Sequence, residues 1–118
     1  MQKEKNKLLN IFKNSNKTKC LIVAEISANH DGKLSRILKI INKAKEIGID
    51  AIKIQLYKPG LITLNSQKKD FLINSKNSWS KYKTLYNLYS RAQTPYGWDN
   101  KINQSCKKNN FILFASVF

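Results

Sequence analysis

Two short apolar runs that end in polar side chains constrain this chain more than any other part of its sequence. Residues 22–30 read IVAEISANH, and residues 51–55 read AIKIQ. An uninterrupted run of β-branched and small apolar residues is typical of a strand that is covered on both faces, as in a parallel sheet. The polar residues at or just beyond the ends of these predicted strands are Glu25, Asn29 and His30 in the first, and Lys53 and Gln55 in the second.

The segment between the two runs predicts a helix. From residue 34 to residue 47, Leu, Ile and Ala recur at helical spacing with Lys and Arg on the other side, and Gly48 follows as a C-cap. Strand, helix and strand together form a βαβ unit. Because ligands bind beyond the carboxyl ends of the parallel strands in such units, Glu25 and Lys53 predict a site.

A long connection, residues 56–77, follows the second predicted strand. A loop of this length in a compact domain is usually functional. We expect short extended pieces within it, at residues 61–64 and 71–73.

Two more helices and a third strand complete the pattern. Apolar and aromatic residues at helical spacing predict one helix over residues 79–92, and Thr94 as N-cap with Pro95 at the first helical position predicts another over residues 96–108. Residues 111–118 read FILFASVF and predict an apolar strand. The aromatic residues before Thr94 predict core packing, with a platform for a sugar as the alternative; they are Trp79, Tyr82, Tyr86 and Tyr89.

The last predicted strand is the most apolar segment, yet no helix follows to cover it. An uncovered apolar edge is an aggregation site, and parallel sheets are buried on both faces. We therefore predict an α/β fold, the N-terminal part (about three βα units) of a TIM (β/α)₈ barrel, whose complete form needs about 250 residues. Residues 1–18 would be a polar, basic leader and residues 19–118 the truncated barrel domain. An open three-layer αβα domain is the alternative.

Composition narrows the class of protein. The chain has 118 residues, of which 42% are hydrophobic and 10% aromatic, and this is typical of a globular domain. No stretch approaches the ~18 apolar residues of a membrane span, and residues 1–18 are too polar for a signal peptide, so we expect a cytoplasmic protein without a membrane partner. Cys20 and Cys106 lie far apart outside any CxxC or Cys/His cluster, and we expect buried, inert thiols.

The formal net charge of +15 does not by itself predict nucleic-acid binding. Nearly all of the 22 basic residues are Lys, and they are scattered along the chain rather than clustered with exposed aromatic residues. We interpret them as a solvated surface whose positive potential helps to attract an anionic substrate.

Several motifs in order resemble one known family. Residues 24–32 (AEISANHDG) and 51–55 (AIKIQ) resemble the opening of the bacterial sialic acid synthase family. Later stretches are similar to its pseudaminic acid synthase branch; they are residues 59–64, 70–73 and 85–89, residues 92–96, Trp79 and Trp98. The resemblance covers about residues 20–118.

The resemblance implies a reaction and a set of partners. Members of this family condense phosphoenolpyruvate with an N-acetylated amino sugar, which gives a nonulosonic acid and phosphate. They use a divalent metal, Mn or Mg, and the resemblance places its ligands outside this chain. It also implies a homodimer for the full-length protein.

The resemblance assigns roles to residues at the predicted strand ends. Lys53 would hold the phosphate or carboxylate of phosphoenolpyruvate, as a cation suited to that anion. Ser116 would donate a hydrogen bond to the phosphate, and Gln55 would add amide hydrogen bonds. Glu25 would be the catalytic carboxylate that faces the sugar, where it would either accept hydrogen bonds from the sugar hydroxyls or help to position water and the metal.

Two further residues match the family's loop motif. We expect Asn29 and His30 to shape the loop after the first strand rather than to bind a ligand. The chain departs from the family where strand three usually ends in Ser-Pro-Phe or Thr-Pro-Phe, because it reads Ser116-Val117-Phe118. Without that proline, the backbone after Ser116 is less constrained.

Catalysis needs several strand ends to converge on one substrate, and two or three of eight do not suffice. We therefore expect this chain alone to be inactive although its parent protein is a synthase. Two alternatives from other classes are a basic nucleic-acid-binding module and a non-enzymatic remnant that pairs its bare strand edge with another copy or with a separate C-terminal half.

Overall fold

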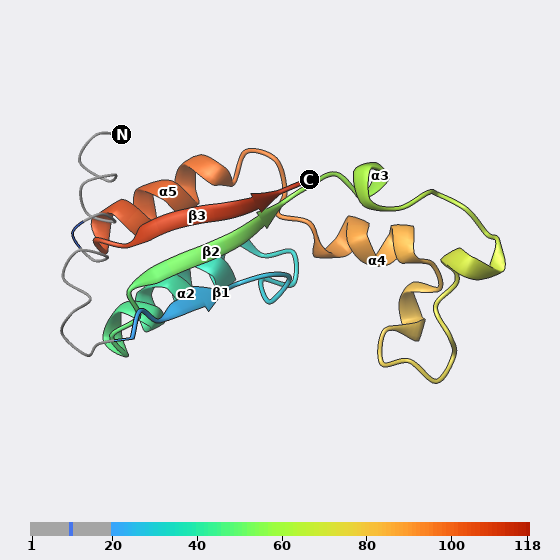
Figure 1. The fold of residues 1–118 in the computed structure, drawn as a ribbon, viewed down its shortest axis with the longest axis horizontal. Helices are drawn as coiled ribbons and strands as arrows, with labels where there is room; N and C mark the ends of the chain where they lie inside the picture. Colours follow the sequence, from blue (N-terminus) through green and yellow to red (C-terminus); the bar gives the residue numbers. More distant parts are fainter. Residues whose placement is uncertain (1–9, 11–19) are drawn as a thin grey trace.

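The fold is built on a three-stranded parallel sheet (Figure 1). The computed structural model describes residue 10 and residues 20–118, so the predicted leader lies almost entirely outside the described residues. The strands are β1 (Val23–Glu25), β2 (Ala51–Leu56) and β3 (Ile112–Val117), in the order β1-β2-β3 with both pairings parallel. The predicted parallel α/β arrangement is confirmed.

Helices α2 (Leu34–Glu46) and α5 (Asp99–Lys108) contact each other and pack on one face of this sheet. In α2, the buried side chains follow the spacing of one helix face, and the helix ends next to Gly48, whose φ is +78°. The core beneath the helices consists of Ile26, Ile37, Ile41, Ala44, Ile52, Ile54, Ile102, Cys106 and Phe111. One face of the sheet is thus apolar and covered by helices, as in the outer layer of a barrel.

The second face of the sheet carries the polar strand residues. Side chains alternate along a strand, so Lys53 and Gln55 share a face that is opposite to Ile52 and Ile54 in the core. On this second face Phe114 is 43% exposed. The two faces therefore differ as the inside and the outside of a barrel wall differ.

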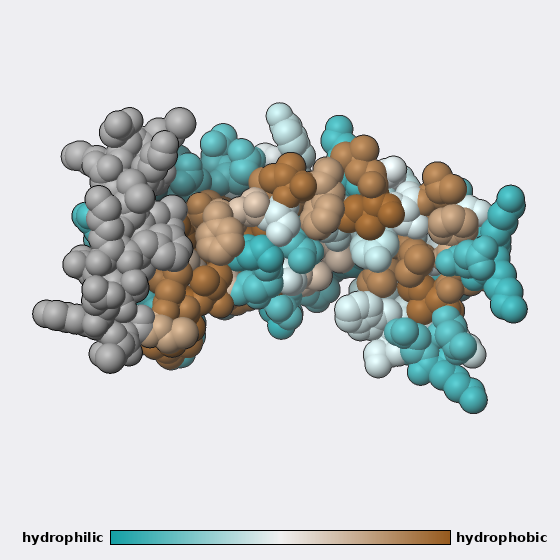
Figure 2. Space-filling model, in the orientation of Figure 1, coloured by the Kyte–Doolittle hydropathy of each residue, from teal (hydrophilic) through white to brown (hydrophobic). Residues whose placement is uncertain are grey.

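The end of β3 is poorly covered, as its sequence predicts. Val117 is 75% exposed and Phe118 is 61% exposed. Figure 2 shows apolar side chains at the surface over this end of the sheet and over the short helix α3 (Pro59–Ile62).

The long connection after β2 is only partly extended. The prediction for residues 61–64 is wrong for Leu61 and Ile62, which belong to α3, because Pro59 fits the first turn of a helix. The prediction for residues 71–73 is wrong for Phe71, which ends the 3₁₀ turn η1 (Lys69–Phe71), whereas Leu72 pairs with Thr84 in an isolated antiparallel bridge.

The helix predicted over residues 79–92 is shorter than its pattern. A 3₁₀ turn, η2 (Ser80–Tyr82), comes first, and Lys83 with φ +65° breaks the helical path. The helix α4 (Leu85–Ala92) begins after Thr84, whose hydroxyl accepts a hydrogen bond from the Asn87 N–H at 3.2 Å. The hydrogen-bonded N-cap at Thr84 therefore decides where the helix begins, although the helical spacing of aromatic residues starts earlier.

The next helix also begins later than predicted. Trp98, not Thr94, is the N-cap of α5, and Thr94 is buried instead. The Trp98 N–H donates to the Pro95 carbonyl in a turn that contains Gly97 at φ +86°, a backbone conformation that favours glycine.

Two predictions from composition have different outcomes. Cys106 is buried in the core as expected, but Cys20 is exposed because it precedes the first strand. Among the described residues, no helix is long and apolar enough to cross a membrane.

The loop after β1 is fastened to the end of α4 through His30. This side chain is fully buried, and its Nδ1 accepts a hydrogen bond from the Gly32 N–H at 3.0 Å. Nδ1 is therefore unprotonated, and the proton lies on Nε2, which donates to the Ala92 carbonyl at 3.2 Å. The edge of the ring also meets Trp98, with centroids 5.6 Å apart.

A second link joins the same loop and helix. Arg91 donates from Nη2 to the Asp31 carbonyl at 2.9 Å and to its carboxylate at 3.2 Å. The Arg91 guanidinium lies against Gly32, whose φ is +67°, and a Cβ at this position would collide with it. The neighbourhood lowers the pKa of His30, chiefly because burial disfavours the charged ring, and Arg91 adds to this, while the Ala92 carbonyl and Asp31 oppose it.

The lowered pKa of His30 predicts a stability that depends on pH. Below the ordinary value of 6.5, the unfolded chain binds a proton that the folded chain does not, so the free energy of unfolding falls as the pH falls. Urea unfolding followed by circular dichroism at about pH 7.5 and about pH 5.5 measures this difference.

The chain has a single histidine, so His30→Gln is a direct control. The variant should be less stable at the higher pH but should lose the pH dependence between these two values. An equal pH dependence in the variant would contradict the assignment to His30.

Candidate functional site

An ion pair joins the ends of the first two strands. Lys53 Nζ lies 2.6 Å from Glu25 Oε2, and each side chain is about one-third exposed. The pair forms because Glu25 and Lys53 are register partners in the parallel pairing of β1 with β2, so their side chains emerge side by side. The structure thus brings together the two residues that the sequence singles out.

Gln55 and Ser116 extend this polar group along the same face. They are register partners between β2 and β3, and Gln55 lies one repeat of the strand beyond Lys53. Both residues are half-buried, and neither side chain makes a hydrogen bond to another described residue. The four predicted residues Glu25, Lys53, Gln55 and Ser116 therefore share one face of the sheet.

This arrangement has a defined chemical capacity. Lys53 offers three N–H donors and a positive charge, and Ser116 adds a hydroxyl donor two residues before the end of the chain. A phosphate or carboxylate matches these donors. Glu25 can accept hydrogen bonds from hydroxyl groups of a second ligand.

Asn29 and His30 lie apart from this group of residues. Asn29 donates from Nδ2 to the Ile26 carbonyl at 2.9 Å, and both ring nitrogens of His30 have partners in the protein. Their hydrogen bonds lie within the loop and between the loop and the end of α4, and their loop-shaping role stays a prediction.

The described residues do not provide a site for a divalent metal. Among residue 10 and residues 20–118, no group of three or more His, Cys, Asp or Glu side chains could hold an ion. His30, the single histidine, has no free ring nitrogen.

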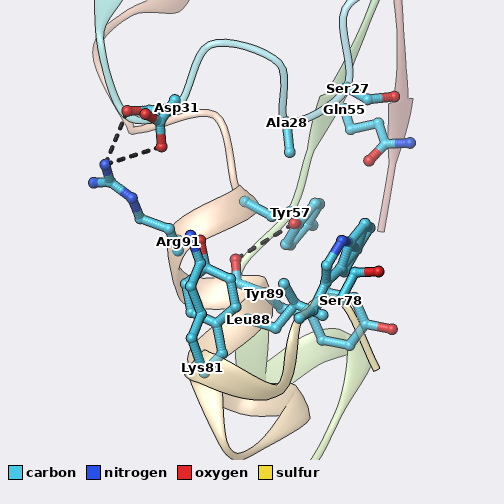
Figure 3. A pocket seen from close by; sticks show the side chains of 13 residues that line it. Ser27, Ala28, Asp31, Gln55, Tyr57, Ser78, Lys81, Leu88, Tyr89 and Arg91 are labelled. Carbon is cyan, nitrogen blue, oxygen red and sulfur yellow. Dashed lines mark hydrogen bonds and ion pairs between the residues drawn. The ribbon is translucent and has the colours of Figure 1, made fainter. Parts of the chain in front are cut away.

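A pocket of about 500 Å³ opens beside Gln55 (Figure 3). Its walls come from the loop after β1, the end of β2, and residues 78–92, which include η2 and α4. The residues that line it are Ser27, Ala28, Asp31, Gln55, Tyr57, Ser78, Trp79, Lys81, Tyr82, Leu88, Tyr89, Arg91 and Ala92.

The pocket contains aromatic residues that the sequence pattern assigned to the core. Trp79 is 52% exposed, so the prediction of core packing is wrong for this residue, and Tyr82 and Tyr89 line the pocket with it. The helical spacing misled because residues 79–84 are not α-helical. In the structure, Trp79 and Tyr82 belong to the irregular segment between β2 and α4, and the length of that segment was the available signal for a site there.

Comparisons with known proteins agree on one family. The model of the NeuB family matches residues 40–118, which include Lys53, Gln55 and Ser116. A pseudaminic acid synthase of Campylobacter jejuni is 48% identical over 100 residues, or 85% of this chain and 29% of that protein. A pseudaminic acid synthase of Helicobacter pylori is 38% identical over 97 residues, or 82% of this chain and 28% of that protein.

A solved structure supports the fold. The N-acetylneuraminic acid (sialic acid) synthetase of Leptospira borgpetersenii superposes with a TM-score of 0.62 at 24% identity and covers 83% of this chain. The chain spans 29% of that protein and a similar share of the synthases above. Since the family model matches more than half of the sequence and the sheet has the corresponding fold, the chain belongs to the NeuB family.

Proposed function

We propose that this chain supplies the N-terminal strand ends of a synthase that condenses phosphoenolpyruvate with an N-acetylated amino sugar. The single observation that carries the proposal is the Glu25–Lys53 pair, on the sheet face opposite the helices. It is supported by relatives that are named as pseudaminic acid synthases. The products would be a nonulosonic acid and phosphate.

The two residues of the charged pair would each contact a different substrate. Lys53 would bind the phosphate or carboxylate of phosphoenolpyruvate, because a charge-assisted hydrogen bond to an anion is stronger than a neutral one. Ser116 and Gln55 lie further along the same face and would add hydrogen bonds. Glu25 would release part of its contact with Lys53 and face the hydroxyl groups of the sugar.

The surface charge would assist the initial attraction of phosphoenolpyruvate to the protein. With a formal net charge of +15, the chain produces a positive potential that attracts phosphoenolpyruvate before any specific contact forms. This attraction is sensitive to salt, whereas the contact with the partly buried Lys53 is less so.

The metal site and the dimer contacts of such an enzyme would be supplied by the rest of the full-length protein. The Mn or Mg ion that the resemblance implies has no fitting set of ligands among the described residues, and we assign it no step here. The homodimer likewise belongs to the full-length protein in this proposal.

Replacing the lysine tests the assignment of the anion site. We expect Lys53→Met to weaken the binding of phosphoenolpyruvate by about 10-fold or more, because a hydrogen bond to a charged group is lost. A titration followed by ³¹P NMR measures the affinity directly.

Lys39→Met is the matched control. Lys39 is exposed on α2, and its replacement removes the same single charge without altering the sheet. An equal loss of affinity in both variants would show that general electrostatic attraction, and not Lys53, binds the anion.

Turnover is expected to need more strands than this chain contains. Because the chain spans 29% of its Campylobacter relative, most of the strand ends that would surround both substrates are missing from it. With phosphoenolpyruvate and N-acetylmannosamine present, a colorimetric phosphate assay should show no release above the protein-free control. Sustained phosphate release by the chain alone would contradict this expectation.

A further inference from the structure

The aromatic pocket begins where the proposed substrate site ends. Gln55 lines the pocket and lies one strand repeat beyond Lys53, and Ser27 lines it two residues beyond Glu25. In Figure 3, Ser27 and Gln55 lie together at one side of the pocket. A ligand held by Glu25 and Gln55 could therefore extend into this space.

The walls of the pocket are suited to an apolar group. Tyr57, Trp79, Tyr82 and Tyr89 line it, together with Leu88 and two alanines. Tyr57 is held in place, because its hydroxyl donates to the Tyr89 carbonyl at 3.4 Å and its ring meets the rings of Tyr89 and Phe118 edge to face. A volume of about 500 Å³ lies within the usual range for small-molecule sites.

The charged side chains that line the pocket contact other residues of its wall. Arg91 is bound to the carbonyl and the carboxylate of Asp31. The ammonium group of Lys81 lies 5.0 Å from the centroid of the Tyr82 ring. Both cations that line the pocket thus contact other residues of its wall, whereas Lys53 is paired with Glu25 at the strand ends and does not line the pocket. The mainly aromatic subsite is therefore separate from the anion subsite at Lys53.

We propose that this pocket receives the acyl substituent of the amino sugar and that Trp79 determines specificity for it. The inference rests on the proposed function. Trp79 is 52% exposed although it is a large apolar residue on the pocket wall, so a ligand can cover its ring. The methyl end of an acyl group would pack on the aromatic rings, and the sugar hydroxyls would remain near Gln55 and Glu25.

The acyl methyl group itself is the probe. Saturation-transfer NMR on the 118-residue chain with N-acetylmannosamine should give the strongest transfer to the acetyl methyl protons. Trp79→Ala should weaken binding about 2- to 12-fold, the range that corresponds to the loss of an aromatic contact. Tyr96→Ala, which removes a fully exposed aromatic residue outside the pocket, should leave the affinity unchanged.

A second variant alters a different part of the pocket wall. Ala28 is exposed on the loop after β1, and Ala28→Phe should fill the pocket and weaken binding without disturbing the core. Equal affinities in the Trp79→Ala and Tyr96→Ala variants would overturn the inference. The inference would also be overturned if the protons of the sugar ring received as much saturation transfer as the acetyl methyl protons.

Binding of phosphoenolpyruvate in the same sample separates this inference from the proposed function. A methyl signal at the pocket without phosphoenolpyruvate binding at Lys53 would contradict the proposed function alone. Phosphoenolpyruvate binding that needs Lys53, with no preferential methyl signal, would contradict the pocket assignment alone.

Discussion

The two parallel pairings of β2, with β1 and with β3, determine where the four side chains of the candidate site lie. The pairing of β1 with β2 sets Glu25 beside Lys53, and the pairing of β2 with β3 sets Gln55 beside Ser116. A slip of one residue in either pairing would turn the polar side chains toward the apolar core. The register is fixed from the other face, where Ile52 and Ile54 fit beneath α2 and α5.

Partial exposure of the ion pair gives it a different character from a structural salt bridge. A fully buried pair loses the hydration of both charges, and breaking it leaves an uncompensated charge in the interior. The side chains of Glu25 and Lys53 are each about one-third exposed, so an anion from solution can reach Lys53 Nζ while water solvates Glu25. The same face exposes Phe114, a position that closure of a barrel would cover.

The sequence predicts the strands and helices whose apolar residues recur at the spacing of a buried face. It also predicts which polar residues lie at the strand ends. The strands and α2 follow directly from apolar patterns, and the pairing of Glu25 with Lys53 follows from the βαβ unit. The connection after β2 is different. There, Thr84 starts a helix through one hydrogen bond, and Lys83 interrupts the path with a positive φ, so the aromatic spacing does not describe a continuous helix.

The sequence patterns could not predict the pocket, because its walls come from segments that lie far apart in the chain. Its walls meet because His30 bonds to the Ala92 carbonyl and Asp31 bonds to Arg91, contacts between segments about sixty residues apart. No local pattern reveals such a contact. Once the loop after β1 is fastened to α4, the aromatic residues of the connection are fixed beside the strand ends.

A crystal structure of the chain with phosphoenolpyruvate tests the central claim most directly. The account predicts that an anionic group of the ligand accepts a hydrogen bond from Lys53 Nζ, on the sheet face opposite α2 and α5, with Glu25 drawn away from the lysine. Phosphoenolpyruvate bound among the exposed lysines of α2, with the Glu25–Lys53 pair unchanged, would contradict it.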